Sequence, residues 1–280
     1  MLVSLIVATY GRQNELTKLL ESLKNQTYKN FEVLIIDQND KISIDSIVFR
    51  YTSKLNIKHI KTSRKGIAHS KNLGIKHSVG ELITFPDDDC KYYPDTLQNA
   101  YDFYNKNPSI DIFYGRVYDI EHNLNIIRNW YVEPMRLNKY NFYLNYSAIT
   151  CFTKRKELLF DENFGIGSNY AMGEELDYIM NALNLKYTVF YTPSISIWHP
   201  QLNVSVMSKE KVFNYAFGYG ATIKKNFNLT FGVFFISSLL YQILHVVIHF
   251  FTANDLMMSK RYLALKGRIM GFLHYKKSYR

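Results

Sequence analysis

The chain has 280 residues, of which 47% are hydrophobic and 21% charged, a balance typical of a folded protein rather than a disordered one. Its 34 Lys and Arg outnumber 24 Asp and Glu, and the net charge of +10 predicts an anionic partner: nucleic acid, a phosphorylated substrate or an acidic membrane surface. Cys90 and Cys151 stand alone, which argues against a disulfide framework or structural zinc and favours a reducing cytosol.

Apolar runs alternate with segments of helical period over the first hundred residues, the pattern of a parallel sheet covered by helices. We expect the chain to open on a strand rather than a signal peptide, because the apolar run at 3–8 follows Met1-Leu2 without a basic start. Strands are predicted at 3–8, 31–37, 57–60 and 81–85, and helices around Leu16 to Leu23 and at about 68–77.

Polar residues follow three of these predicted strands. They are Thr9-Tyr10, Asp37-Gln38 and the run Asp87-Asp88-Asp89. Ligands of parallel sheets collect at the carboxyl ends of the strands, so we expect the three segments to meet at one crevice.

The acidic run 87–89 is the most informative of the three segments. Adjacent carboxylates repel one another, so a fold keeps them most easily where a cation or strong donors compensate their charge. Mg²⁺ prefers oxygen ligands and is commonly shared between carboxylates and substrate phosphates, which favours a metal site. A solvated acidic turn that caps the helix near Pro94 is the alternative.

The second half of the chain carries further strands and one helix with acids at its start. Strands are predicted at 111–120, 147–153, 188–191 and 194–198, the last ending at His199-Pro200, and a helix at 173–183. The aromatic and basic stretch that ends at Tyr146 has no clear hydrophobic period, so its sequence predicts no division into strands and helices.

The tail changes character. Residues 226–254 contain no Asp, Glu, Lys or Arg, and the apolar segment 231–251 is long enough to span a bilayer. Its polar residues fall on one helical face, and cations flank it on both sides, which favours an interfacial or shallowly inserted helix over a true span; a buried helix of a soluble domain is the alternative. The stripe is Ser238, Gln242, His245, His249 and Thr252, and the cations are Lys209, Lys211, Lys224, Lys225, Lys260, Arg261, Lys266, Arg268, Lys276, Lys277 and Arg280.

Five segments in this order resemble the inverting nucleotide-sugar glycosyltransferases of family 2. They are VSLIVATYGR (3–12), FEVLIIDQND (31–40), the stretch from Gly66 through PDDDC (66–90), GEELD (173–177) and Trp198-His199. The resemblance implies an α/β fold of GT-A type, a Rossmann-like mixed sheet with helices on both faces, over residues 1–205. Residues 206–280 are expected to form a helical, basic and apolar region that associates with membrane.

The resemblance also implies a divalent cation, Mg²⁺ or Mn²⁺, that bridges the donor diphosphate. Asp89, Asp87 and His199 are its expected ligands, with Asp89 the principal one. Glu175 is the expected general base, which takes the proton of an acceptor hydroxyl as that hydroxyl attacks the anomeric carbon, and Glu174 is second choice. Without the resemblance, Glu174 and Glu175 are equally well explained as helix-start acids.

The nucleotide-sugar is expected to meet residues from every predicted loop of the crevice. One departure from the family pattern leaves the base open: Asp37 is followed by Gln38 where many members carry a second acid, and an amide can pair with uracil, thymine or guanine. The expected contacts are Ala8, Thr9, Tyr10, Arg12, Asp37, Gln38, Arg64, Lys71, Asp87 and Asp88, with Lys65 as a further phosphate contact.

The function expected from the resemblance is transfer of a sugar to a hydroxyl of a lipid-linked glycan at the cytoplasmic face of a bacterial membrane, for a capsule, O-antigen or exopolysaccharide. Rings around Trp130, Tyr131 and 140–146 could stack on the acceptor, or pack ordinarily. The alternatives are a polyprenyl-phosphate acceptor, a sugar-1-phosphate nucleotidyltransferase, and a non-catalytic carbohydrate-binding protein at the membrane surface. Nucleic acid is not expected, because the basic tail surrounds an apolar helix rather than a stacking platform.

Overall fold

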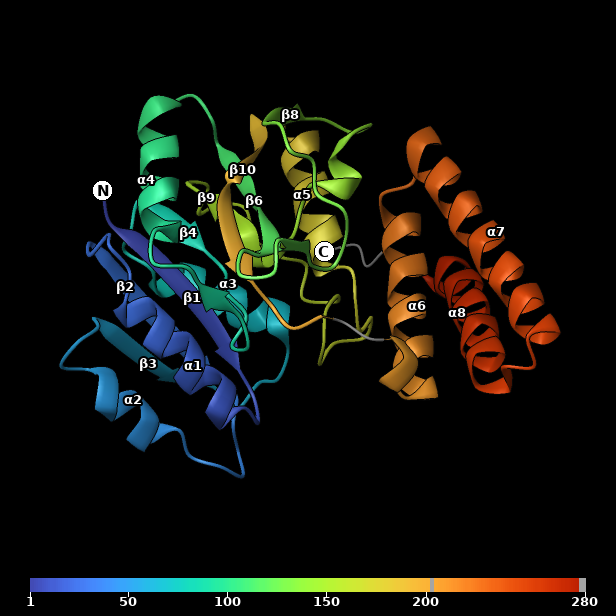
Figure 1. Ribbon diagram of the computed structural model, residues 1–280, viewed down its shortest axis with the longest axis horizontal. Helices are drawn as coiled ribbons and strands as arrows, with labels where there is room; N and C mark the ends of the chain where they lie inside the picture. The colour runs from blue at the N-terminus through green and yellow to red at the C-terminus, as the bar shows by residue number, and fades with distance from the viewer. Residues whose placement is uncertain (202–203, 277–280) are drawn as a thin grey trace. The chain divides into compact units, whose positions relative to one another are not determined.

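A computed structural model of the chain describes residues 1–201 and 204–276. They form two compact units, one of residues 1–65, 69–159 and 181–201, the other of 66–68, 160–180 and the remainder from 202 (Figure 1). The elements are β1 (Val3–Thr9), α1 (Gln13–Lys24), β2 (Phe31–Asp37), α2 (Asp45–Tyr51), β3 (Ile57–Lys61), α3 (Ile67–His77), β4 (Leu82–Thr84), β5 (Lys91–Tyr92), α4 (Thr96–Lys106), β6 (Ile112–Asp119), β7 (Leu124–Asn125), β8 (Met135–Leu137), η1 (Phe142–Leu144), η2 (Ala148–Thr150), β9 (Cys151–Thr153), α5 (Glu174–Asn184), β10 (Val189–Trp198), η3 (Val204–Val206), α6 (Lys209–Lys225), α7 (Leu229–Phe251) and α8 (Asp255–His274).

The first unit is built on a mixed sheet with the strand order β3-β2-β1-β4-β9-β6-β10-β5. β1 runs parallel to β2 and β4, while β9 is antiparallel to both β4 and β6, so β6 and the parallel β10 point the same way as β1. Thr9 lies opposite Asp37, and Ala8 forms an isolated parallel bridge with Asp87. The predicted meeting of the three polar segments at one edge is confirmed.

Helices cover both faces of this sheet. The odd-numbered positions of β1 (Val3, Leu5, Val7) form one core cluster with the leucines of α1 and with apolar residues of α2 and α4. Alternate residues of a strand point to opposite faces, and Ile6 packs against α3 on the other side. There a Cβ on Gly74 would lie 2.2 Å from Ile6 Cγ2, so only glycine allows α3 this close.

Most predicted elements of the first hundred residues are confirmed within one or two residues, but two later predictions are wrong. Residues 147–150 contain the 3₁₀ turn η2, and only Cys151–Thr153 form a strand, β9. The two strands expected at 188–191 and 194–198 are one strand, β10, whose pairing with β6 shifts register between Tyr191 and Ser196. Pro193 lies within that shift, and proline has no N–H for the ladder.

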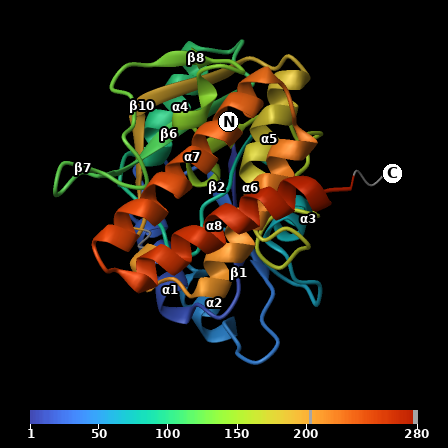
Figure 2. The ribbon, with the colours of Figure 1, turned by 90° about the vertical axis from the view of Figure 1, so that its right-hand side faces the viewer.

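The second unit contains the helices α6, α7 and α8. α6 and α8 approach closely through glycine: a Cβ on Gly271 of α8 would lie 1.9 Å from the carbonyl oxygen of Phe217 on α6. α7 packs on α8, where Phe235 stacks on Phe272 with centroids 4.7 Å apart (Figure 2). Of the part of the chain that the structure describes, α7 is the helix long and apolar enough to cross a membrane.

The polar stripe predicted on this helix is confirmed for four of its five residues. Ser238, Gln242, His245 and His249 are buried or half-buried, and Gln242 is 2% exposed. Thr252 is exposed and caps the end of α7. Lys277 and Arg280 lie outside the described residues, and a domain boundary at residue 205 stays a prediction.

Candidate active site

The acidic run 87–89 and His199 are joined through the sheet. After the bridge between Asp87 and Ala8, the chain turns, with Cys90 N–H donating to the carbonyl of Asp87 at 3.2 Å. It then forms β5, which pairs antiparallel with the end of β10: Lys91 lies opposite Trp198. Two segments more than a hundred residues apart in sequence are thereby held side by side where β10 ends.

Asp87, Asp89 and His199 form a cluster in which one ligand atom from each lies within 4.8 Å of the others. His199 Nε2 lies 3.2 Å from Asp89 Oδ1 and 3.8 Å from Asp87 Oδ2. Nδ1 lies 2.7 Å from the carbonyl oxygen of Pro200, which can only accept, so Nδ1 carries a proton. Nε2 is the ring nitrogen that faces the carboxylates.

The cluster is mostly buried, and this shapes its electrostatics. Burial disfavours a charged imidazole, but the contact with Asp89 and the charge of Asp87 outweigh it and raise the pKa of His199. Burial likewise opposes ionisation of Asp89, yet His199 and Arg12 together lower the pKa of that carboxyl. Each of the two groups therefore favours the charged form of the other.

Asp88 has a different surrounding from its two neighbours. It is 5% exposed, accepts a hydrogen bond from Thr9 Oγ1 at 2.8 Å on one oxygen and one from Arg12 Nη1 at 2.8 Å on the other. Burial raises its pKa, although Arg12 and Thr9 oppose the change. Asp88 thus fixes the acidic run to Thr9 at the end of β1 and to Arg12. It is not one of the three residues of the cluster.

The cluster fits a divalent cation. Asp89 Oδ1 is buried and has no hydrogen-bond partner of good geometry, although it lies at ion-pair distance from His199. Two carboxylates and an imidazole nitrogen are ligands that Mn²⁺ and, for the oxygens, Mg²⁺ accept. These are the three residues that the sequence predicts as metal ligands.

Asp37 lies beside the cluster as the centre of a hydrogen-bonded network. Its Oδ1 accepts from the backbone and side-chain nitrogens of Asn39 at 2.9 and 2.7 Å, and Oδ2 lies 2.9 Å from His59 Nε2. Asn39 Oδ1 in turn accepts from Gly11 N–H at 2.7 Å. Sequence reasoning missed Asn39 and His59. The Asp-x-Asn turn is a local signal for Asn39, but His59 reaches Asp37 only through the β2–β3 register.

The loop after β1 supplies an exposed ring, Tyr10, and one cation, Arg12, and further cations come from the segment between β3 and α3 and from α3 itself. The ring of Tyr10 is 53% exposed, with Lys65 Nζ 4.4 Å from its centroid, and Lys65 also donates to the carbonyl of Gln38. Arg12 Nη1 lies 2.6 Å from Asp89 Oδ2. The remaining predicted contacts differ in exposure: Arg64 is exposed, Gln38 and Lys71 are buried, and Ala8 is half-buried.

The aromatic stretch predicted to meet the acceptor is divided between core and surface. Trp130 is buried and stacks on Tyr191, and Tyr146 is buried beside Phe142, so these rings pack in the interior. Tyr131 and Tyr140 are exposed. These two present exposed rings on which a sugar could stack, and Tyr143 is half-buried.

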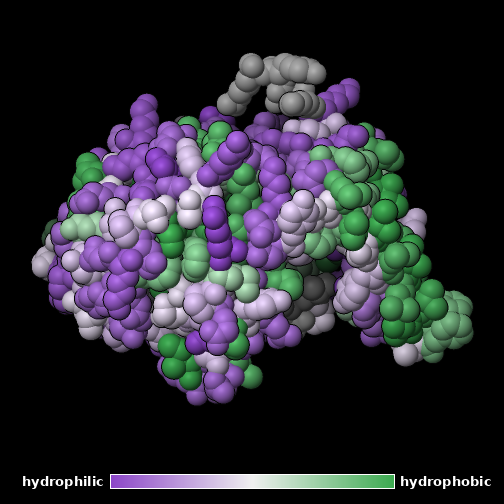
Figure 3. All heavy atoms as spheres, turned by 90° about the horizontal axis from the view of Figure 1, so that it is seen from above, coloured by the Kyte–Doolittle hydropathy of each residue, from purple (hydrophilic) through white to green (hydrophobic). Residues whose placement is uncertain are grey.

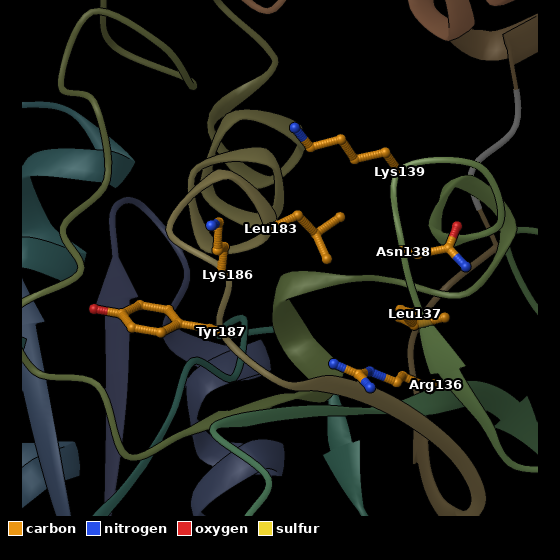
Figure 4. A pocket seen from close by; sticks show the side chains of 7 residues that line it. All are labelled: Arg136, Leu137, Asn138, Lys139, Leu183, Lys186 and Tyr187. Carbon is orange, nitrogen blue, oxygen red and sulfur yellow. The ribbon is translucent and has the colours of Figure 1, made fainter.

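A separate pocket of 540 Å³ lies at the other end of β10 (Figure 4). Leu137 in its wall pairs with Val189, the first residue of β10, whereas His199 follows the last. Because the two ends of a ten-residue strand lie about 30 Å apart, this pocket is distinct from the carboxylate cluster. Its lining is Arg136, Leu137, Asn138, Lys139, Leu183, Lys186 and Tyr187.

Glu174 and Glu175 belong to the second unit, at the start of α5. Glu174 is buried beside Gly165, and Glu175 is half-buried. Two residues further, fully buried Asp177 bonds Lys225 Nζ at 2.7 Å and Asn226 Nδ2 at 3.0 Å, and Lys225 also bonds Asp161 at 2.7 Å. This network ties the first turn of α5 to the end of α6, and the role of Glu175 as base stays a prediction.

Comparison with known sequences identifies relatives. The model of glycosyl transferase family 2 matches residues 4–173. The poly(ribitol-phosphate) beta-N-acetylglucosaminyltransferase TarS of Staphylococcus aureus is 33% identical over 113 residues, 39% of this chain and 20% of that protein. An uncharacterized glycosyltransferase of Haemophilus influenzae is 33% identical over 114 residues, 40% and 38% of the two chains. The matches thus span less than half the length of these curated relatives.

Solved structures share the fold. TarS residues 1–349 in complex with UDP-GlcNAc align with a TM-score of 0.61 and 21% identity, over 80% of this chain and 66% of that one. The mannosyltransferase PcManGT of Pyrobaculum calidifontis, in complex with GDP-Man and Mn2+, aligns with a TM-score of 0.61 and 16% identity over 96% and 73%. The predicted GT-A fold is confirmed.

Proposed function

Because the chain belongs to glycosyl transferase family 2, we propose that it transfers a sugar from a nucleoside-diphosphate donor to a hydroxyl of a glycan acceptor, with inversion at the anomeric carbon. The observation that carries the proposal is the cluster of Asp87, Asp89 and His199 at the carboxyl edge of the sheet, next to Asp37 and the exposed ring of Tyr10. The carboxyl ends of the strands are where open α/β sheets bind nucleotides.

Each group beside the cluster has a proposed task. Tyr10 stacks on the base and Asp37 accepts from it or from the ribose, held in place by Asn39 and His59. Asp87, Asp89 and His199 hold a divalent cation, which when bound offsets the charge of the departing diphosphate. Arg12 is close enough to the cluster to meet the same diphosphate.

Glu175 is the proposed general base, with Glu174 as second choice. Both glutamates lie in the first turn of α5, and a carboxylate is a side chain that can accept the proton of the attacking hydroxyl. A single displacement then inverts the anomeric carbon and needs no covalent nucleophile on the protein.

The acceptor is proposed to be a lipid-linked or cell-surface glycan at the cytoplasmic face of a membrane. TarS, named for a poly(ribitol-phosphate) acceptor, supports a cell-surface polymer of this general kind. The apolar helix α7 supports a location at the membrane. The fold is compatible with either a UDP-sugar or a GDP-sugar as donor, since the two structural relatives were solved with UDP-GlcNAc and GDP-Man.

A binding screen tests the donor site directly. Purified protein is titrated with UDP, TDP, GDP and CMP, in Mn²⁺ or in chelator, and the screen is repeated on Asp89→Ala and on Asp102→Asn, an exposed acid of α4. We expect one nucleotide to bind only with metal, and binding to disappear in Asp89→Ala but not in Asp102→Asn. Folded protein that binds no nucleotide under any condition would point to the non-catalytic alternative.

A further inference from the structure

The outward face of α7 is apolar along its whole length. Val233, Ile236, Leu240, Leu244, Val247 and Phe251 recur at spacings of three and four residues, and each is between 46% and 80% exposed. The spacing places them on one side of the helix. Figure 3 shows hydrophobic side chains gathered in this helical region of the surface. A continuous apolar face of this size is a binding surface rather than ordinary solvent-exposed protein.

The opposite face of α7 is polar and faces protein. Gln242 is buried, and Ser238, His245 and His249 are half-buried. α8 packs along this side: Arg268 Nη1 donates to the carbonyl of Ser238 at 3.1 Å, and Arg261 lies 5.4 Å from the ring of Tyr241. A helix on a soluble protein buries its apolar face and exposes its polar one, and α7 does the reverse.

Almost all of the net charge of the chain lies, by sequence, after residue 201. Residues 202–280 hold eleven Lys and Arg against Glu210 and Asp255, which gives nine of the ten net positive charges. Lys209, Lys211, Lys224, Lys266 and Lys276 are exposed. The surface around α7 therefore combines an apolar face with a strong positive charge, which complements a bilayer that contains anionic lipid.

We propose that α7 docks in the interfacial zone of an anionic lipid bilayer with its axis in the plane of the membrane. A second copy of the chain would bring two strongly positive regions together, whereas anionic headgroups neutralise them. The proposal concerns lipid binding alone and does not rest on the transfer reaction.

The packing of α7 on α8 decides between lying in the membrane and crossing it. Arg261 and Arg268 of α8 contact the middle and the first half of α7, and Lys260 and Lys266 are carried by the same helix. A spanning α7 that kept these contacts would draw all four cations towards the hydrocarbon core, which is costly. In the plane of the membrane, α7 lies at the acyl boundary while α8 stays on the aqueous side.

Vesicle flotation of the full chain tests the lipid partner. Binding to phosphatidylcholine vesicles should increase at least about tenfold when phosphatidylglycerol is included, and should weaken in high salt. Leu240→Glu with Leu244→Glu keeps good helix formers but should lower binding at least about tenfold. The matched control, Phe49→Glu with Val79→Glu, adds the same charge at exposed apolar sites of the sheet unit and should bind normally.

A second measurement tests the orientation. Val233, Leu240 and Val247 lie seven residues apart on the exposed face and can be replaced singly by cysteine for spin labelling, because Cys90 and Cys151 are buried. In-plane docking predicts one shallow depth, about 5 to 10 Å, at all three sites. A label at 240 much deeper than those at 233 and 247 would establish a spanning helix and overturn the proposal.

Failure of vesicle binding is informative as well. Folded protein that ignores anionic vesicles, and whose mass rises with concentration unless Leu240→Glu and Leu244→Glu are present, would assign this face to a second copy instead. Nucleotide binding is measured in the same preparation without lipid, so loss of the docking proposal leaves the donor site untouched.

Discussion

The guanidinium of Arg12 lies 2.6 Å from Asp89, the acid predicted to be the principal metal ligand. Burial lowers the pKa of Arg12, but the charges of Asp88 and Asp89 outweigh it and raise that pKa, so the guanidinium remains charged. A cation bound to Asp89 would therefore sit near an existing positive charge.

Removal of Arg12 should change metal and nucleotide binding in opposite directions. Without the repulsion from the guanidinium, Arg12→Ala should bind Mn²⁺ about three- to tenfold more tightly in the absence of nucleotide. Nucleoside diphosphate should bind more weakly, since one phosphate contact is lost. Titration calorimetry measures both. Arg12→Lys keeps the charge and should resemble wild type in metal binding, and tighter binding of both ligands in Arg12→Ala would contradict the proposed phosphate contact.

Asp88 and Asp89 should respond differently to the same substitution. Asp89→Asn should abolish Mn²⁺ binding, because it removes a ligand charge. Asp88→Asn should retain Mn²⁺ binding but lower the free energy of unfolding by about 1 to 3 kcal/mol, since one of its two hydrogen bonds, from Thr9 or from Arg12, is disrupted in a buried place. Metal titration and urea unfolding of both variants check the pair. Equal loss of metal binding would place Asp88 among the ligands.

Tyr10 should contribute to nucleotide binding but not to folding. Its ring is 53% exposed, so Tyr10→Ala should leave the thermal midpoint nearly unchanged. Loss of a stacking partner should weaken nucleotide binding by about 1 to 3 kcal/mol, and Tyr10→Phe should preserve it. Fluorescence titration with the nucleotide found in the screen distinguishes the two variants; if both bind like wild type, the base lies elsewhere.

Lys224 and Lys225 are adjacent in sequence but differ in their partners: exposed Lys224 lies 4.9 Å from the ring centroid of Phe272, whereas Lys225 pairs with acids. Lys225 bonds Asp161 and fully buried Asp177, and burial, which lowers its pKa, is outweighed by those acids, so its pKa is raised. Lys225→Met should lower the free energy of unfolding by about 3 to 5 kcal/mol, because the buried Asp177 loses the cation that it pairs with. Exposed Lys224→Met should change it by less than about 0.5 kcal/mol. Chemical unfolding measures the free energy of unfolding of both variants. A loss in Lys225→Met as small as that in Lys224→Met would show that Asp177 finds another partner.

The strands β1 to β4 and the helices α1 and α3 follow from hydrophobic period, whereas the short helix α2 is not predicted. The parallel pairing of β1, β2 and β4 makes Thr9, Asp37 and Asp87 neighbours, as their places after apolar runs predict. Two-residue strands such as β5 and β7 carry no period of their own and exist only through their partners. The register shift of β10 likewise depends on the neighbouring strand, with only Pro193 as a local sign.

The residues of the candidate site are likewise only partly predictable from the sequence. The acids at 87–89 are visible in the sequence as a charged run after a strand, and the family resemblance adds His199 and Glu175. The sequence does not show which of the three acids has which role. Burial and hydrogen bonds to Thr9 and Arg12 distinguish Asp88 from its two neighbours. His59 could not be predicted from the sequence for a similar reason, since its contact with Asp37 depends on the pairing of β2 with β3.

The short ladder between Lys91 and Trp198 has a consequence for how a cation would be captured. The ladder holds the segment that follows Asp89 beside the segment that precedes His199 in the folded protein. The two segments are distant in sequence, but they are already adjacent when an ion binds. The conformational entropy of bringing the two segments together is lost on folding, before any ion binds. The affinity for the ion then depends mainly on small side-chain adjustments.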